Sequence, residues 1–598
     1  MSDSSKNKIL DIVKYLPIFV YIVIIPLVTK SKLAKYNFKF KDLYIGNHID
    51  VFNYYKAKLI IYFAIVSFLI LLYLFFKNKE KYKKILFQKK YLIIVFMAVM
   101  VIISHLFSKF PKISSRGFYT KFENTYVYLS YLFMVVYTSV IIKEKKGLTI
   151  LSYMIVFSGI IMSIIGVMQY LKVDPLRFEF FRKNFLQING KGNVNYKMPL
   201  GRVYLTIYNP NYVGTYVGMI FSYLLGIIIF FEDKILKFFS LILLPFLGLI
   251  LIGSKSDAGL LTVSVVTLIF IFHNIYIFIK SDKKDIKVFI IIGILLISSF
   301  VTYKKVPEIK KMVNELKVEK NIIYGLVGIE IDNENKRQLN LKYRTKDKTY
   351  DYKIKFNTQN NQFNLQVYDS NEKVLKTENL ENGSYKVIDD IIKKFNILVN
   401  KEKINNKNYI AMRIKIDNRP WDFLVNKNGF NAIRRKGENI IPVDLSIAKG
   451  TKFFDGYEKI GSTRGYIWSR SIPLIDKFVF IGGGADTYPI YFPQNDRAIK
   501  DKIGNRYIVV DKPHNIYIYY IFSFGLLFLI AFIYLNLYTV YGNIKTFNKL
   551  YYPAIYLIIS YLIVGVFNDS SVTVSPIFWC VLGYLLGSTN NTLQNKNV

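Results

Sequence analysis

The sequence predicts an all-α, polytopic membrane bundle of about twelve transmembrane helices, with an inserted extracellular domain that is β-rich and sandwich-like. Three observations predict this fold. Hydrophobic residues make up 52% of the 598-residue chain and recur in long blocks. One long hydrophilic stretch, 304–515, interrupts these blocks. Within that stretch apolar and polar residues alternate, which is typical of strands with one face in water.

Apolar blocks stand on both sides of the hydrophilic stretch. In 1–303 they lie near 10–28, 57–76, 91–107, 126–142, 149–170, 211–231, 236–252, 258–279 and 286–303. In 516–598 they lie near 516–541, 551–567 and 572–587, before a polar tail. Because a helix needs about 20 apolar residues to cross the hydrocarbon layer, each block is predicted to be a transmembrane helix. The first block lacks the cleavage site of a removable signal peptide.

Basic loops predict the orientation of these helices, because lysine and arginine are enriched in short cytoplasmic loops. The loop 77–90 carries seven lysines, and the loops 143–147, 280–287 and 542–549 are also short and basic. All of them fall on one side if both termini are cytoplasmic, although the opposing loop 29–56 is lysine-rich too. We therefore predict that both termini and the tail are cytoplasmic, and that 171–210 and 304–515 are extracellular.

The stretch 304–460 is predicted to be the β-rich inserted domain. Runs at 350–356, 363–367 and 410–416 alternate between apolar and polar residues, and polar turns separate them. A lysine-rich helix is expected at 304–320, and a short helix at 389–398, where apolar residues recur at helical spacing. Trp421 and the pair Arg434 and Arg435 suit contact with sugar or phosphate; a core tryptophan and a solvated basic pair are the preferred interpretation.

Charge and cysteine content exclude several classes of protein. The net charge of +40 would suggest a nucleic-acid partner in a soluble protein. The apolar blocks instead make the lipid bilayer the expected partner, and we expect no nucleic acid. A single cysteine, Cys580, excludes a disulfide framework and an iron–sulfur cluster. With four histidines in the chain, we expect no metal site and no cofactor.

Residues suited to catalysis or ligand binding are concentrated in the loops predicted to be extracellular. The segment 461–515, predicted to be a catalytic loop, contains Arg464 four residues before Trp468, then three consecutive glycines at 482–484. It ends with Lys512, Pro513, His514 and Asn515 at the start of an apolar block. Upstream, Arg202 precedes the turn Asn209-Pro210-Asn211, and Arg116 lies in the loop between the third and fourth blocks.

These motifs resemble the O-antigen ligase and polysaccharide polymerase family of bacterial membrane glycosyltransferases. The resemblance is carried by Arg202 with the Asn-Pro-Asn turn, Arg464 with Trp468, the glycine turn, and His514 with Asn515, and it does not cover the β-rich insertion. The turn 253–259, GSKSDAG, is similar to a serine-rich turn of the family, with Asp257 where arginine is usual. The resemblance implies transfer of a glycan from an undecaprenyl-diphosphate carrier to an acceptor hydroxyl, on a glycan or another cell-surface acceptor, at the outer face of the bacterial cytoplasmic membrane.

The residue types suit that reaction. Planar guanidinium groups bind diphosphate oxygens bidentately, so Arg202 and Arg464 are predicted to stabilise the leaving group. The imidazole of His514 is predicted to orient the acceptor hydroxyl or take its proton. The predicted substrate contacts are Asn209, Asn211, Trp468, Asn515, Lys512 and Arg116. No carboxylates cluster near these arginines in the sequence, which favours a metal-independent reaction.

Other interpretations stay open at this point. The same motifs serve ligation of a finished glycan and polymerisation of repeat units. A lipid-linked glycan transporter and a membrane sensor are functions of other classes. Arg464 is alternatively an interfacial anchor, His514 an interfacial hydrogen-bonding residue, and Asp569 a helix cap.

Overall fold

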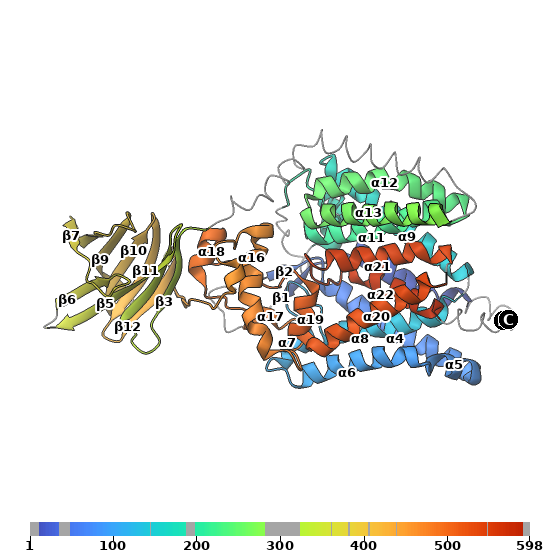
Figure 1. The fold of residues 1–598 in the computed structure, drawn as a ribbon, viewed down its shortest axis with the longest axis horizontal. Helices are drawn as coiled ribbons and strands as arrows, with labels where there is room; N and C mark the ends of the chain where they lie inside the picture. Colours follow the sequence, from blue (N-terminus) through green and yellow to red (C-terminus); the bar gives the residue numbers. More distant parts are fainter. Residues whose placement is uncertain are drawn as a thin grey trace.

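The computed structural model describes residues 11–34, 48–143, 145–186, 198–280, 323–359, 362–380, 383–404, 407–437, 439–546 and 548–589. The predicted ninth span, 286–303, the helix expected at 304–320 and the predicted polar tail from residue 590 onward lie outside these residues. Three parts follow one another along the long axis of the molecule (Figure 1). A helical part lies at one end, a β domain at the other, and residues 452–514 lie between them.

Among the described residues, seven helices are long and apolar enough to cross a membrane. They are α4 (Tyr54–Lys77), α6 with its preceding turn (Lys89–Leu106), α9 (Lys145–Tyr170), α11 (Pro210–Phe230), α12 (Lys234–Ser254), α13 (Asp257–Lys280) and α20 (Leu526–Ile544). Three apolar helices are shorter, namely α8 (Thr125–Ile141), α21 (Tyr552–Val564) and α22 (Ser575–Ser588). The sequence predicted about twelve spans, so the described helices confirm that prediction in part.

Two predicted spans are broken. The block 10–28 forms three short pieces, α2 (Leu16–Phe19), a π-helical turn (Val20–Ile24) and α3 (Ile25–Leu27). The block 516–541 is divided into α19 (Ile516–Phe524) and α20 by Gly525, which has a positive φ of 90°. A Cβ at Gly525 would lie 2.6 Å from the carbonyl oxygen of Phe480, so this break lets residues 479–480 pack directly against the helix.

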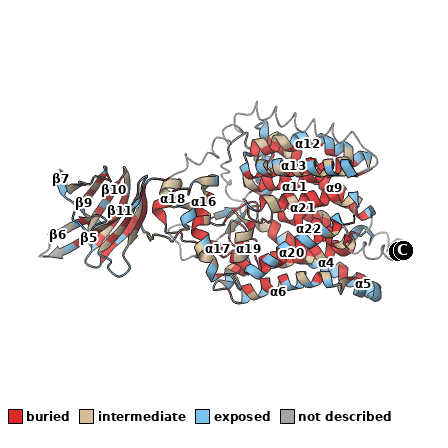
Figure 2. Cartoon of the chain, in the orientation of Figure 1, coloured by how far each residue is buried: buried red, intermediate tan, exposed pale blue. Residues whose placement is uncertain are grey.

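Burial divides the helical part into a central core and an apolar outer surface (Figure 2). The helix α11 is buried almost throughout and packs against α12, α13 and α21, while α22 packs against α8. The outer helices expose large apolar side chains: Tyr62, Ile65, Phe68 and Leu69 on α4, and Ile235, Phe238 and Leu241 on α12. An apolar outer surface on helices of this length is typical of a multi-pass membrane protein.

The β domain contains two antiparallel sheets that share one core. The larger sheet has the strand order β13-β12-β11-β10-β9-β8-β7, and the smaller has β3-β4-β5-β6. The strands of the smaller sheet are β3 (Gly325–Ile331), β4 (Gln338–Arg344), β5 (Thr349–Gln359) and β6 (Gln362–Tyr368). Those of the larger are β7 (Thr377–Leu380), β8 (Ser384–Val387), β9 (Phe395–Ile404), β10 (Lys407–Ile416), β11 (Arg419–Asn426), β12 (Gly429–Lys436) and β13 (Asn439–Pro442). The strands occupy 325–442, within the predicted domain 304–460.

The predicted alternation is confirmed in β5 and β10, whereas the helix predicted at 389–398 is wrong. Tyr352, Ile354 and Phe356 of β5 are buried, as are Met412, Ile414 and Ile416 of β10. In the segment 389–398, the carboxylate of Asp389 accepts hydrogen bonds from the backbone N–H groups of residues 391 and 392, which forms a turn. The chain then enters β9, where Phe395 and Ile397 are buried at strand spacing.

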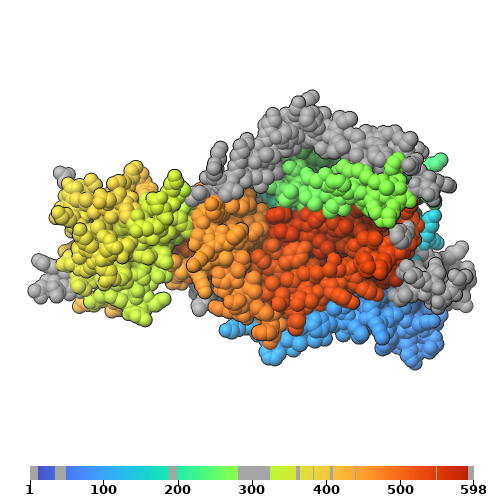
Figure 3. All heavy atoms as spheres, viewed as in Figure 1, coloured from blue at the N-terminus to red at the C-terminus, as the bar shows by residue number. Residues whose placement is uncertain are grey.

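Residues 452–514 form a compact block of short helices between the other two parts (Figure 3). The block contains α16 (Ile460–Ser471), α17 (Tyr488–Tyr491), α18 (Arg497–Ile503) and two 3-10 turns (Lys452–Phe454 and Ile472–Lys477). A buried ion pair joins it to the smaller sheet, since Nη1 of Arg344 lies 2.9 Å from a carboxylate oxygen of Glu458. We call this block the junction segment.

Candidate active site at the end of the helical part

A cavity of about 810 Å³ lies where the junction segment meets the helical part. Its lining comes from five stretches of chain that are far apart in the sequence: 49–53, 119–120, 207–212, 463–467 and 503–514. Tyrosine rings and polar groups mix on this lining, with Tyr119, Tyr208 and Tyr212 beside Asn209 and Asp511. A concave site of this size, with a few polar groups on a largely apolar wall, is typical of a ligand-binding pocket.

His514 lines this cavity and is held in an unusual backbone conformation. Its φ is +51°, in the left-handed region that side chains other than glycine rarely adopt. The indole N–H of Trp468 donates a 2.9 Å hydrogen bond to the carbonyl of Pro513 and so fixes the residue before it. Thr463 and Tyr208, also on the lining, have positive φ values too. Such conformations persist where the surroundings enforce them, and they cluster at functional sites.

A carboxylate lies behind the imidazole of His514. Nδ1 of His514 is 3.6 Å from Oδ2 of Asp569, and the side chain of Asp569 is fully buried. Burial, together with the nearby cations Lys512 and Arg464, lowers the pKa of His514 to about 3, so the ring is neutral near pH 7. Asp569 was predicted to cap a helix; instead it lies against His514 and the backbone N–H of Asn515, because the next helix, α22, begins only at Ser575.

Arg464 is almost fully buried beside the cavity wall. It follows three residues in left-handed conformation, Gly461, Ser462 and Thr463. Its guanidinium donates to the carbonyl oxygens of Phe567 (2.9 Å) and Gly461 (2.8 Å) and to the side-chain oxygen of Asn568 (3.4 Å). A guanidinium has five N–H groups, so these contacts orient it and leave donors for an anionic ligand.

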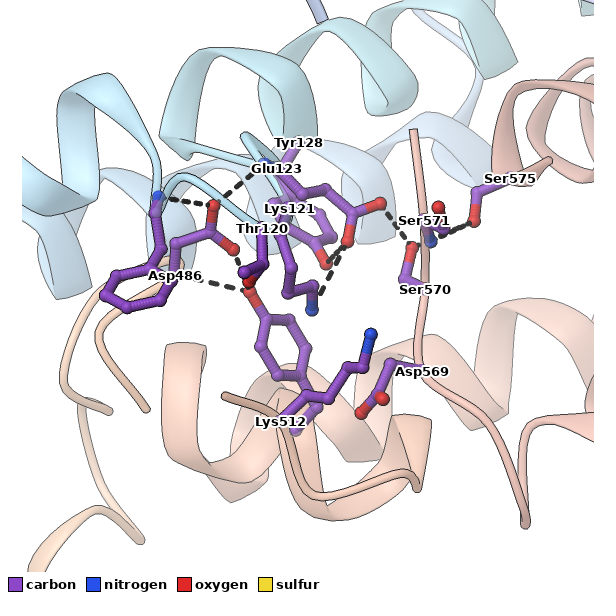
Figure 4. Close-up of polar contacts among 12 residues, drawn as sticks. Thr120, Lys121, Glu123, Tyr128, Asp486, Lys512, Asp569, Ser570, Ser571 and Ser575 are labelled. Carbon is purple, nitrogen blue, oxygen red and sulfur yellow. Dashed lines mark hydrogen bonds and ion pairs between the residues drawn. The ribbon is translucent and has the colours of Figure 1, made fainter. Parts of the chain in front are cut away.

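The side chains of Lys121 and Lys512 lie among the carboxylates of Glu123, Asp486 and Asp569 (Figure 4). Nζ of Lys121 lies 3.7 Å from the carboxylate of Glu123 and 3.5 Å from the ring centre of Tyr519, and it has no hydrogen-bond partner among the described residues. Burial opposes the charged form of Lys121, but Glu123, Asp569 and Asp486 raise its pKa overall. Lys121 is therefore a buried ammonium group that three surrounding carboxylates stabilise.

Asp486 holds the loop that carries Lys121. Its carboxylate accepts hydrogen bonds from the backbone N–H groups of Phe118 (3.0 Å) and Glu123 (2.8 Å) and from the hydroxyl of Tyr519 (3.0 Å). The junction segment therefore fixes the loop between α6 and α8 at the cavity.

The carboxylates correct one premise of the sequence prediction. None cluster in the sequence, but folding brings Glu123, Asp486, Asp511 and Asp569 around the same cations, because each comes from a different loop. Within the described parts of the chain, no three side chains of histidine, cysteine, aspartate or glutamate converge as ligands of a metal ion.

Some predicted site residues line the cavity, others hold its frame, and two lie apart from it. His514, Lys512 and Asn209 line the cavity, and Nζ of Lys512 is 3.3 Å from the hydroxyl of Tyr212. A second group holds the frame, with Trp468 bonded to Pro513, Asn211 accepting from Asn568, and Asn515 capping α19. We infer that this second group positions the site, although the sequence predicted substrate contacts.

Arg202 and Arg116 lie apart from the cavity lining. Arg202 is on the turn beside the link from α12 to α13, where the next residue, Val203, donates its N–H to the carbonyl of Gly253. Nε of Arg202 is buried without a hydrogen-bond partner in the described residues. Arg116 ends α7 (Pro111–Arg116) and lines a separate cavity of about 410 Å³. Of the cations that act on His514, Lys512 and Arg464 have the largest effects on its pKa.

The glycine turn at 482–484 serves packing. The N–H groups of Gly483 and Gly484 donate to the carbonyl oxygens of Phe522 and Ser523, at the end of α19. A Cβ at Gly482 would lie 2.4 Å from the backbone nitrogen of Phe524. These glycines let the junction segment approach the break between α19 and α20.

The chain matches no family model, no curated protein and no solved structure.

Sequence reasoning missed several residues of this site. Asp486 lies two residues after the last of the three glycines, and Asp511 precedes Lys512, so both stood within motifs that had already been selected. The residues Asp50, Tyr119 and Tyr212 carried no signal of their own, because their role depends on which loops meet at the cavity.

Proposed function

We propose that this protein is a membrane glycosyltransferase with about twelve passes that transfers a glycan from an undecaprenyl-diphosphate carrier to an acceptor hydroxyl in cell-surface polysaccharide assembly. The proposal places it in the bacterial cytoplasmic membrane, with both termini inside and 304–515 outside. One observation carries it. A neutral imidazole, His514, lies against the carboxylate of Asp569 and lines a cavity at the end of the apolar helices together with Lys512, while Arg464 is buried beside this lining.

The chemistry follows from these groups. Nε2 of His514 accepts the proton of the acceptor hydroxyl while the hydroxyl oxygen bonds to the anomeric carbon of the donor sugar. The bond from that carbon to the diphosphate oxygen breaks, and the diphosphate leaves with the electron pair. Lys512 and Arg464 stabilise the charge of the leaving group. Asp569 positions the ring and stabilises the imidazolium that forms.

Donor binding also strengthens the base. Burial and the cations Lys512 and Arg464 lower the pKa of His514. A diphosphate beside those cations offsets their charge and so raises the pKa of the imidazole. His514 then becomes a better proton acceptor when the donor is in place.

A transfer assay with purified components tests the proposal. The full chain is reconstituted in vesicles with an undecaprenyl-diphosphate-linked oligosaccharide and a hydroxyl acceptor, and products are resolved by mass. We expect His514→Asn to lower the rate at least about 100-fold, because a positioned general base contributes about 10² to 10⁴. The matched control is His273→Asn, since His273 lies in α13 and contacts the hydroxyl of Tyr556.

The outcomes distinguish the competing functions. Addition of one glycan per acceptor indicates a ligase, and a ladder of repeat units indicates a polymerase of the same kind. Movement of the donor across the bilayer without transfer indicates a transporter and contradicts the proposal. So does full activity of the His514→Asn variant.

A further inference from the structure

A second cavity, of about 470 Å³, lies between the larger sheet and the junction segment. Five guanidinium groups and a single carboxylate line it. The arginines are Arg413, Arg434, Arg435, Arg497 and Arg506, and the carboxylate is Asp422. The aromatic rings of Trp421 and Tyr507 also belong to the lining, with several aliphatic side chains. Carboxylates pair with three of these arginines (Asp422 with Arg413, Glu402 with Arg435 and Asp501 with Arg506), so the described lining keeps an excess of positive charge that suits an anion.

Aromatic stacking holds three of these guanidinium groups in place. Arg434 lies 3.9 Å from the ring centre of Tyr507, and Arg497 lies 5.1 Å from the same ring. Arg506 lies 4.0 Å from the ring of Trp421. Hydrogen bonds add to this restraint, because Nε of Arg497 donates to the carbonyl of Asp444 and Nε of Arg506 donates to the carboxylate of Asp501. Guanidinium groups held in this way lose little conformational freedom when they bind an anion.

Two ion pairs fix the remaining arginines. Arg413 contacts Asp422 at 2.6 Å, and Arg435 contacts Glu402 at 2.6 Å. The first pair joins the neighbouring strands β10 and β11, whereas the second reaches from β12 to β9, and both hold arginines that line the cavity.

The indole N–H of Trp421 is an independent indication that this cavity binds a ligand. It is 4% exposed, and its indole Nε1 is buried with no hydrogen-bond partner in the described part of the chain. Buried polar groups are nearly always hydrogen-bonded, so an N–H on the lining of a polar cavity without an acceptor is unusual. An oxygen of a ligand would supply the acceptor.

One stretch of chain separates the two cavities. Residues 503–505 and 508–512 line the first cavity, whereas Arg506 and Tyr507 line the second. A ligand in the second cavity therefore contacts the same segment that leads into Lys512 and His514.

We propose that the second cavity binds an acidic sugar unit, in which guanidinium groups receive a carboxylate or phosphate and the rings of Trp421 and Tyr507 contact the sugar. That the anion is carried by a glycan rests on the function proposed above, whereas the anion site itself does not. An acidic glycan bound here would be separated from the transfer site by the segment 503–512, which lines both cavities.

Binding to the full chain in detergent tests this inference by titration calorimetry. The probes are glucuronate and glucose 6-phosphate, with glucose as the neutral control and inorganic phosphate as the control without sugar. We expect saturable binding of both acidic sugars and weaker binding of both controls. Arg434→Gln is expected to weaken acidic-sugar binding at least about tenfold, since a charge-assisted hydrogen bond is lost.

The matched control is Lys436→Gln, which removes the same charge two residues further along β12, outside the cavity lining. We expect this variant to bind like the wild type. Equal binding by the two variants, or wild-type binding of acidic sugars no tighter than that of glucose, overturns the inference and leaves the arginines a purely structural role. Phosphate binding as tight as that of glucose 6-phosphate overturns the sugar assignment. If the chain binds glucuronate but transfers no glycan, the proposed function fails and the anion site stands.

Discussion

The junction segment and the β domain each contain an ion pair between an arginine and an aspartate. The distances between the charged atoms are similar in the two pairs, but the burial of the side chains differs widely. In the junction segment Nε of Arg470 lies 2.9 Å from Asp496, and the side chains are 7% and 1% exposed. In the β domain Nε of Arg413 lies 2.6 Å from Asp422, and the side chains are 45% and 19% exposed. The shorter pair is the one that water screens. Distance alone therefore does not rank these interactions, and burial decides the outcome of breaking each pair.

The two pairs also arise differently from the chain. Arg413 and Asp422 face each other across β10 and β11, so a hairpin brings them together. Arg470 and Asp496 are joined through the fold of the junction segment, where burial raises the pKa of Asp496 against the effect of Arg470. The pair in the β domain is therefore formed by local strand pairing, and the pair in the junction segment by tertiary packing.

Breaking the buried pair gives the largest expected effect. Arg470→Gln leaves the carboxylate of Asp496 buried without its charged partner, which we expect to lower the free energy of unfolding by about 3–5 kcal/mol. The measurement is thermal unfolding of the purified chain in detergent. A double variant, Arg470→Met with Asp496→Leu, is expected to recover much of the loss, because it removes both charges. If the single variant unfolds at the wild-type temperature, burial is not the deciding factor.

Breaking the exposed pair gives a much smaller effect. We expect Arg413→Gln to lower the free energy of unfolding by less than about 1 kcal/mol, because exposed ion pairs are screened by water. The difference from wild type should shrink further when the salt concentration is raised. A loss as large as that of Arg470→Gln would contradict the comparison.

The same contrast explains what could be predicted from sequence. The strand β10 was predictable because Met412, Ile414 and Ile416 repeat every second residue and face the core. The helix predicted at 389–398 was wrong because Asp389 forms a local turn, after which the apolar residues continue as a strand. Gly525 broke a predicted span, because a close approach of residue 480 requires it, and no sequence pattern encodes that approach.

The candidate site was predictable only where its residues are neighbours in sequence. Lys512 and His514 stand in one motif and line one cavity. Asp569 and Lys121 come from other loops, and their proximity to His514 depends on how the helices pack. Residue type suggested a diphosphate site with Arg202, but the fold places that side chain beside the link from α12 to α13.

The smallest expected effect concerns pH, and it tests whether burial acts on His514 as it acts on Arg470 and Asp496. The neutral imidazole is the active form, and burial lowers its pKa from 6.5 to about 3. We therefore expect kcat/KM for the donor, which reports groups of the free enzyme, to change less than about twofold between pH 7.5 and 5.5. An ordinary imidazole would lose about tenfold over that range, because it is half protonated near pH 6.5. Lys512→Gln removes one of the cations that lower the pKa, so its profile, whatever its absolute rate, should fall at a higher pH than that of the wild type. A wild-type half-loss near pH 6.5 would show that His514 is open to water and that burial does not set its charge.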